Sequence, residues 1–223
     1  MGTAGTADRR GRRARRPSPS CWRTHGVTGR PDSAAAGQAE RLYRLAWLFY
    51  LGLALAGSLW IGLGLGLRRG GPIPLRLFVD PARWWLDAAV GAAAGLALLA
   101  CWWALRRLLP AARALEDRLG ELLGGLTAPQ AVALAALSGF AEELFFRGAV
   151  QGAVGWLAAS LLFALLHSGP GRELRLWTLF ALCAGLLFGA LMLWRGNLLA
   201  PVVAHFVVNA VNLYRLRGAP VAS

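Results

Sequence analysis

The chain has 223 residues, of which 57% are hydrophobic and only 16% are charged, with a formal net charge of +13. A soluble domain normally carries about a quarter charged residues, so this composition argues against a soluble protein. All 24 basic residues are arginines; ten precede residue 45, and most of the others border apolar blocks. This distribution fits anionic lipid headgroups and membrane topology rather than a DNA-binding surface. We therefore expect membrane lipids, and no nucleic acid, as partners.

Residues 1–40 are rich in arginine, serine, proline, glycine and alanine. A segment of this kind buries too little apolar surface to fold by itself, which predicts a disordered N-terminal tail. No apolar segment follows its first arginines closely enough to form a cleaved signal peptide.

Two apolar blocks come next, Leu45–Leu67 and Trp84–Leu105, joined by a connection that glycines and prolines interrupt. At ~1.5 Å per residue, each block is long enough to cross a bilayer. The one charge of the second block, Asp87, lies within a turn of its start, where we expect an interfacial or capping residue. Residues 41–127 are thus interpreted as two transmembrane helices and an amphipathic connector.

The connector carries leucines at positions 115, 119, 122, 123 and 126 with charged residues between them, which predicts a helix on the membrane surface. Thr127, two residues before Pro129, is a helix-start signal. The fold class predicted is all-α: a polytopic membrane bundle of about six transmembrane helices plus this surface helix. The last four spans, which fill most of residues 128–217, are Ala128–Val150, Ala153–His167, Leu176–Trp194 and Leu198–Tyr214.

Six spans place both termini on one side of the membrane. That side carries 18 arginines outside the spans, and the opposite side carries five. Since an excess of basic residues marks the cytoplasmic side, both termini are predicted to be cytoplasmic.

Few polar groups in the last four spans are candidates for function. Ionisable residues inside a membrane cost ~2.5–3.5 kcal/mol each on insertion scales, so they usually face the bundle interior and serve a function. The alternative is that these groups only satisfy one another and hold the helices together. The candidate site residues are Glu142, Glu143, Arg147, His167, His205 and Asn209.

Helical spacing predicts different surroundings for the two adjacent glutamates. Glu143 and Arg147 are four residues apart and can form an ion pair, whereas Glu142 is rotated ~100° away. His205 and Asn209 also share one helix face. In straight helices, Glu142 and His205 lie ~12 Å and ~10 Å from the same membrane side, and His167 lies deeper, at ~21 Å.

A carboxylate with two histidines in a low-dielectric cavity is suited to activating water as a general base. A second histidine and an amide group can donate hydrogen bonds to a developing oxyanion. These parts describe amide hydrolysis without a covalent intermediate. The same Glu142, His167 and His205 could instead bind a divalent metal such as zinc, as in a metalloprotease, although the spacing is not HExxH. The sequence leaves both mechanisms open.

Three motifs, "EELFFR", "FALLH" and "HFVVN", follow one another on successive apolar spans. In this order they resemble the CAAX protease and bacteriocin-processing (CPBP) family of intramembrane proteases, which includes the type II CAAX prenyl endopeptidases. The resemblance covers residues ~128–214 and implies that residues 128–217 form the catalytic membrane domain. It implies Glu142 as the base assisted by His167, Glu143 with Arg147 as a structural pair, and His205 with Asn209 near the oxyanion or metal.

The function predicted is therefore that of an intramembrane endopeptidase acting on a membrane-associated peptide or protein, with prenylation of the substrate left open. The lysine-free composition suggests a bacterial cell membrane. The alternative is a non-catalytic relative that binds a peptide or lipid as an immunity or scaffold protein. A proton-coupled transporter is disfavoured, because the spans show no paired repeat.

Overall fold

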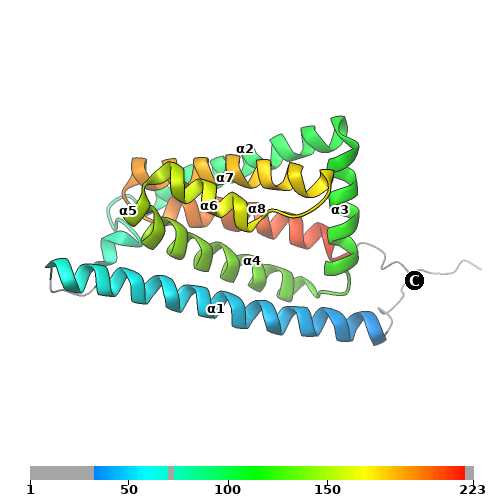
Figure 1. Ribbon diagram of the computed structural model, residues 1–223, viewed down its shortest axis with the longest axis horizontal. Helices are drawn as coiled ribbons and strands as arrows, with labels where there is room; N and C mark the ends of the chain where they lie inside the picture. Colours follow the sequence, from blue (N-terminus) through cyan, green and yellow to red (C-terminus); the bar gives the residue numbers. More distant parts are fainter. Residues whose placement is uncertain (1–32, 70–72, 219–223) are drawn as a thin grey trace, which may run out of the picture. The chain divides into compact units, whose positions relative to one another are not determined.

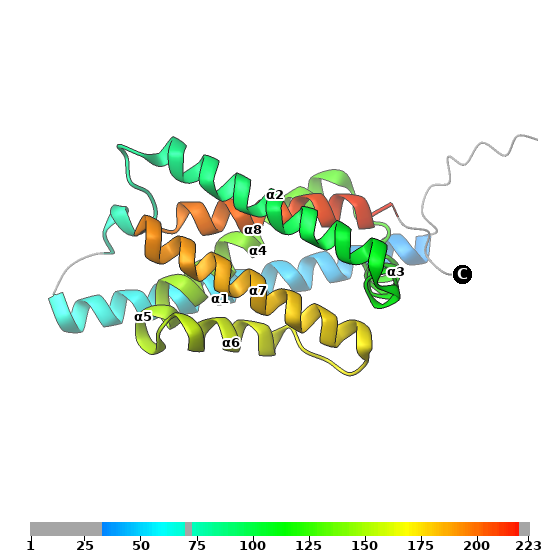
Figure 2. The ribbon, with the colours of Figure 1, turned by 90° about the horizontal axis from the view of Figure 1, so that it is seen from above.

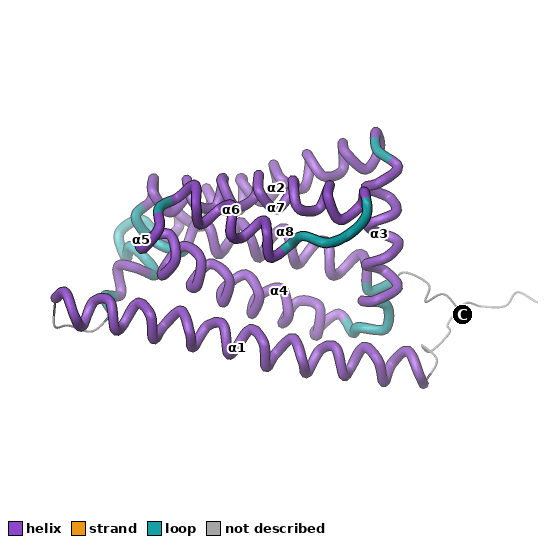
Figure 3. The backbone as a smooth tube through the Cα atoms, in the orientation of Figure 1, coloured by secondary structure: helices purple, strands orange, loops and turns teal. Residues whose placement is uncertain are grey.

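The structure is a computed structural model that describes residues 33–69 and 73–218. Every regular element in these ranges is helical, which confirms the all-α prediction (Figure 3). Residues 1–32 of the predicted tail lie outside the described residues. The elements are α1 (Ser33–Arg69), η1 (Leu75–Leu77), α2 (Trp84–Leu108), α3 (Pro110–Leu123), α4 (Ala128–Glu143), the π-helix η2 (Leu144–Val150), α5 (Gln151–Val154), α6 (Trp156–Leu166), α7 (Arg172–Arg195) and α8 (Leu199–Leu216).

Within residues 33–69 and 73–218, four helices are long and apolar enough to cross a membrane: α1, α2, α7 and α8. A fifth span is present if α3 and the segment Ala128–Val154, which are bent by 112° to each other, count as one. The polytopic membrane bundle is confirmed, with four or five spans rather than the predicted six. One of the predicted spans, Ala153–His167, corresponds to α6. This helix has only 11 residues and is ~16 Å long, which is too short to cross a hydrocarbon core of ~30 Å.

Helix α1 begins earlier than the composition predicts. Residues 33–40, which we assigned to the disordered tail, form its first turns. Alanine, glutamine and glutamate are good helix formers, which explains this difference. Glu40 also accepts a hydrogen bond of 2.9 Å from Gln130 Nε2, so the start of α1 is held against the start of α4.

The predicted surface helix corresponds to α3, which runs across one end of the bundle while α1, α4, α7 and α8 run lengthwise (Figure 1). Its buried positions Ala112, Leu115, Glu116 and Gly120 lie on one face. Glu116 Oε1 accepts a hydrogen bond of 2.9 Å from Trp102 Nε1, which fixes this face to α2. Helix α3 therefore closes the end of the bundle at which α1 begins.

Helix α8 packs between α2 and α4, and these two contacts are the most extensive in the bundle (Figure 2). Gly91 and Gly95 of α2 face the backbone of α8 so closely that a methyl group on Gly95 would lie 2.7 Å from Ala204 O. On the other side, a methyl group on Gly139 of α4 would lie 3.2 Å from Phe206 N. Small residues on both neighbours thus let the three helices approach closely.

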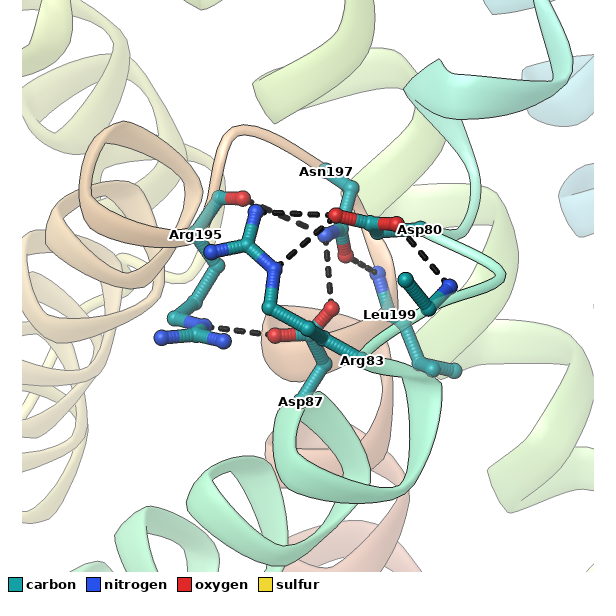
Figure 4. A network of polar contacts seen from close by, with 7 residues as sticks. Asp80, Arg83, Asp87, Arg195, Asn197 and Leu199 are labelled. Atoms are coloured by element: carbon teal, nitrogen blue, oxygen red, sulfur yellow. Dashed lines mark hydrogen bonds and ion pairs between the residues drawn. The ribbon is translucent and has the colours of Figure 1, made fainter.

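A polar cluster fastens the start of α8 to the start of α2 (Figure 4). Asp87 is fully buried and accepts hydrogen bonds from Arg195 Nε at 2.5 Å and Asn197 Nδ2 at 2.8 Å. Asn197 Oδ1 in turn accepts from the backbone N–H of Leu199, at 3.0 Å. Asp87 makes none of the capping bonds that we expected, because its carboxylate is used by the turn between α7 and α8 instead.

The close approach of α2 and α8 predicts that Gly91→Ala lowers stability by about 1–3 kcal/mol, since the new methyl group would overlap Ala200 O and the helices must move apart. Thermal unfolding in detergent micelles measures the effect. Gly52→Ala is the matched control, because Gly52 is also helical but has nothing within 4 Å of the added methyl group. Equal unfolding temperatures for the two variants would contradict this packing.

Candidate active site

The helix that carries both glutamates begins at a capping box. Thr127 N donates to Gln130 Oε1 at 2.9 Å, and Gln130 N donates to Thr127 Oγ1 at 3.4 Å, which confirms the predicted helix start. Beyond Glu143 the backbone continues without a break into the wider π-helical turns of η2, which contain Arg147. Such π-helical segments are rare and often occur at functional sites.

Glu143 and Arg147 form a buried ion pair, as their spacing predicts. The side chains are almost completely buried, and Arg147 Nε lies 3.1 Å from Glu143 Oε2. The arginine also donates to Gly185 O at 3.2 Å and stacks over the ring of Phe163, at 4.6 Å from its centroid. The other carboxylate oxygen, Glu143 Oε1, lies 2.7 Å from His205 Nδ1. Glu143 therefore joins two helices through two partners.

Glu142 has a different environment. Its Oε2 atom is buried and has no hydrogen-bond partner among the described residues. The nearest imidazole nitrogens are His167 Nε2, at 3.8 Å, and His205 Nε2, at 3.9 Å. These separations are too long for direct hydrogen bonds. They leave room for a small molecule that contacts all three groups.

The hydrogen bonds of the two Nδ1 atoms indicate the tautomer of each histidine, and therefore whether the Nε2 atom near Glu142 is a donor or an acceptor. His167 Nδ1 lies 2.8 Å from the carbonyl oxygen of Phe163, which can only accept, so Nδ1 carries a proton. His205 Nδ1 faces Glu143 in the same way. In the neutral imidazoles, both Nε2 atoms are therefore acceptors directed toward Glu142.

Asn209 lies one turn beyond His205 and donates from Nδ2 to Ser138 Oγ, at 2.9 Å. Helices α4 and α8 are thus joined by two polar contacts, Glu143 with His205 and Ser138 with Asn209, on either side of the close approach at Gly139. These contacts fix the side of α8 that carries His205 and Asn209 against α4.

A cavity of about 350 Å³ lies in front of these groups. Four of the six predicted site residues line it: Glu142, His167, His205 and Asn209. Glu143 and Arg147 do not line it and lie behind His205. The remaining walls are mainly apolar and aromatic and include Trp102, Phe163, Trp177, Phe180 and Phe188. The structure therefore brings the predicted residues together around one pocket.

Several residues of this pocket are not among those predicted from the sequence. Tyr50 of α1 lines it and lies close enough to the Glu142 carboxylate to interact with its charge. Ser138 and Asn212 also line it. Asn212 could have been found, because it lies seven residues after His205 and therefore on the same helix face. Tyr50 gave no such signal, since a lone tyrosine in an apolar span resembles a lipid-facing residue.

The spacing of the candidate metal ligands is wide for a metal site. Ligand atoms of a tetrahedral zinc ion lie about 3.3–3.5 Å apart, whereas both histidine nitrogens are 3.8 Å or more from Glu142 Oε2. Over residues 33–69 and 73–218, no group of three or more His, Cys, Asp or Glu side chains has the arrangement of a metal site. As it stands, the geometry of Glu142, His167 and His205 does not fit a bound zinc ion.

Comparison with known proteins shows what this region is similar to. Residues 124–211 match the Rce1-like family, described as type II CAAX prenyl endopeptidase Rce1-like, and this range includes all six predicted site residues. The "Uncharacterized protein YpbD" of Bacillus subtilis (strain 168) is 41% identical over 91 residues, which are 40% of this chain. The aligned part spans about half of that relative, 47% of its length. No solved structure matches the chain. The resemblance carried by the three motifs is confirmed over residues 124–211.

The two adjacent glutamates should differ in their effect on stability. Glu143→Gln leaves Arg147 buried without its counter-charge, which typically costs about 3–5 kcal/mol. Glu142→Gln removes a charge that pairs with no arginine among the described residues, so we expect unchanged or slightly higher stability. Unfolding in a denaturing detergent measures both variants. A Glu142→Gln variant as unstable as Glu143→Gln would contradict the different roles assigned to the two glutamates.

Proposed function

We propose that the chain is an intramembrane endopeptidase in which Glu142 activates water to hydrolyse a peptide bond. The observation that carries this proposal is that Glu142, unlike Glu143, lines the cavity, where its Oε2 atom faces two histidine nitrogens at 3.8 and 3.9 Å. The match of residues 124–211 to a family of endopeptidases supports the same reaction class. The apolar walls of the cavity favour a membrane-associated peptide or protein as the substrate.

The reaction begins with a water molecule held between Glu142 and His167. Glu142 takes a proton from the water as the oxygen attacks the carbonyl carbon of the substrate. The carbonyl oxygen becomes an oxyanion, and Asn209 Nδ2 stabilises it by donating a hydrogen bond, together with His205 Nε2 when that ring is protonated. The C–N bond then breaks, and the proton on Glu142 passes to the departing amine. Glu142 is ionised again, and no covalent intermediate forms.

Glu143 and Arg147 act behind the pocket in this proposal. The Glu143 carboxylate accepts the Nδ1 proton of His205, which directs Nε2 toward the cavity. Arg147 balances the charge of Glu143 inside the bundle. We assign the pair a structural role, as the resemblance implies.

We infer the membrane orientation from the arginine distribution, which favours the cytoplasmic side for the end of the bundle at which α1 begins, α3 lies and α8 ends (Figure 1). Glu116, Leu119 and Leu123 of α3 line the end of the cavity. We infer that a substrate segment reaches the pocket from this cytoplasmic end or from the adjacent bilayer. The composition favours a bacterial cell membrane.

Glu142→Gln should abolish cleavage, with a loss of at least about 10²–10⁴-fold, because the amide cannot accept a proton from water. The full chain is produced in bacterial membranes, and new peptide termini are identified by mass spectrometry. Glu121→Gln, which changes an exposed glutamate on α3, is the control and should keep full activity. Products that persist in Glu142→Gln would favour the non-catalytic alternative, a peptide- or lipid-binding immunity or scaffold protein. Lipid-modified and unmodified substrates are distinguished by the masses of the products.

The wide spacing around Glu142 also predicts that cleavage does not depend on a bound metal. Purified protein treated with a strong chelator, dialysed and returned to proteoliposomes should cleave at the rate of the untreated protein. Loss of activity that added zinc restores, and that magnesium does not, would support a metal held by Glu142, His167 and His205 instead.

A further inference from the structure

Ser138 is a buried polar residue to which neither the sequence motifs nor the proposed reaction assigns a role. It lies one turn before Glu142, is 2% exposed and lines the same cavity. Its hydroxyl donates to Ala135 O within α4, at 3.3 Å, and accepts from Asn209 Nδ2 of α8, at 2.9 Å. Ser138 is therefore in contact with a group that the proposed reaction uses.

The two hydrogen bonds of Ser138 fit one orientation of the Asn209 amide. A serine hydroxyl has one proton, and here that proton is directed to Ala135 O. The oxygen can then meet Asn209 only as an acceptor, so the NH2 group of the amide, and not its oxygen, faces α4. Without this contact the two orientations of an asparagine amide are similar in shape and differ only in their hydrogen bonds.

The orientation matters because only one of the two ends of the amide can stabilise an oxyanion. Nδ2 has two protons; one is bound to Ser138 and the second remains for a group in the cavity that Asn209 lines. The reversed amide would present a second oxygen to the developing negative charge and oppose it. The hydrogen bond between Ser138 and Asn209 thus affects whether Asn209 can donate to the oxyanion, although Ser138 itself does not contact the reacting atoms.

A second buried serine shows what a purely structural hydroxyl does in this bundle. Ser160 of α6 is also 2% exposed, and its hydroxyl donates to Trp156 O of its own helix, at 2.9 Å. It does not line the cavity. Serines often bond back to their own helix in this way. Ser138 differs because it also bonds to another helix at the pocket.

We propose that Ser138 is a positioning residue that holds the Asn209 amide with its NH2 group directed at the reaction cavity. The proposed role in turnover rests on the endopeptidase function argued above. The orientation itself is a property of the resting protein and can be tested without any substrate.

The chain is well suited to that test because it contains three asparagines, Asn197, Asn209 and Asn212. Protein labelled with nitrogen isotope at asparagine gives only three side-chain NH2 signals in solid-state NMR spectra of proteoliposomes. The full chain, Ser138→Ala and Ser160→Ala are compared, and Asn209→Ala assigns the signal. Asn197, whose Nδ2 is bound to Asp87, serves as the internal reference.

In Ser138→Ala we expect the Asn209 signal to shift and broaden while the Asn197 signal stays in place. In Ser160→Ala we expect all three signals to stay in place. An Asn209 signal that is unchanged in Ser138→Ala overturns the proposal, whether or not the protein cleaves a peptide.

Turnover is measured with the Glu142-dependent cleavage product identified by mass spectrometry. Ser138→Ala should reduce turnover at saturating substrate at least about tenfold, a part of the loss expected when an oxyanion donor is removed. When Ser138→Ala is combined with Asn209→Ala, turnover should be no lower than in Asn209→Ala alone, because Ser138 acts through Asn209. A Ser138→Ala loss of equal size in both backgrounds would indicate a structural role and overturn the proposal. Cleavage that does not depend on Glu142 would instead overturn the proposed function and leave the NMR result to decide the orientation.

Discussion

The whole site depends on the burial of the Glu143 carboxylate inside a helix bundle. A buried charge is costly unless it is paired, and Glu143 forms an ion pair with Arg147 from its own helical segment and contacts His205 of α8 through Oε1. Each partner is held in turn, the arginine by Gly185 O of α7 and by aromatic rings of three elements. One charge therefore links the segment that carries Glu142 to α6, α7 and α8.

This arrangement explains how adjacent glutamates serve different purposes. The side chain of Glu143 lies between Arg147 and His205, so it adds rigidity and does not line the cavity. Glu142, one residue earlier, lies on the cavity side and keeps an oxygen without a partner among the described residues. A rigid framework around a group left available for reaction is what catalysis by positioned groups requires. The glycines of α2 and the Asp87 cluster extend this rigidity to the start of α8.

Much of this could be predicted from the sequence, because helical periodicity relates nearby residues directly. The spacing of Glu143 and Arg147 predicts their ion pair, and the three motifs predict the groups that line the pocket. The expected depths of Glu142 and His167 were both wrong by several ångströms, since they assumed helices that end at Val150 and begin at Ala153. In the structure, Glu142 lies 12 residues before the end of α5 and His167 lies 11 residues after the start of α6, so both are ~16–18 Å from the reversal at Gly155.

Contacts between distant residues could not be predicted in the same way. Asp87 and Arg195 are 108 residues apart, and nothing in their local sequence relates them. Ser138 resembles any small residue at a helix interface until Asn209 is placed beside it. The first turns of α1 were missed because the composition of residues 1–40 was judged as a whole, which concealed the helix formers at its end.

The short helix α6 has a consequence for the surrounding lipid. It ends at Leu166, and the chain then continues through Ser168–Gly171 as a loop before α7 begins. A helix shorter than the hydrocarbon layer creates a hydrophobic mismatch, which lipids relieve by local thinning. We therefore expect the bilayer to be compressed beside α6, which would bring the aqueous phase nearer to His167 and shorten the distance that water travels to the pocket.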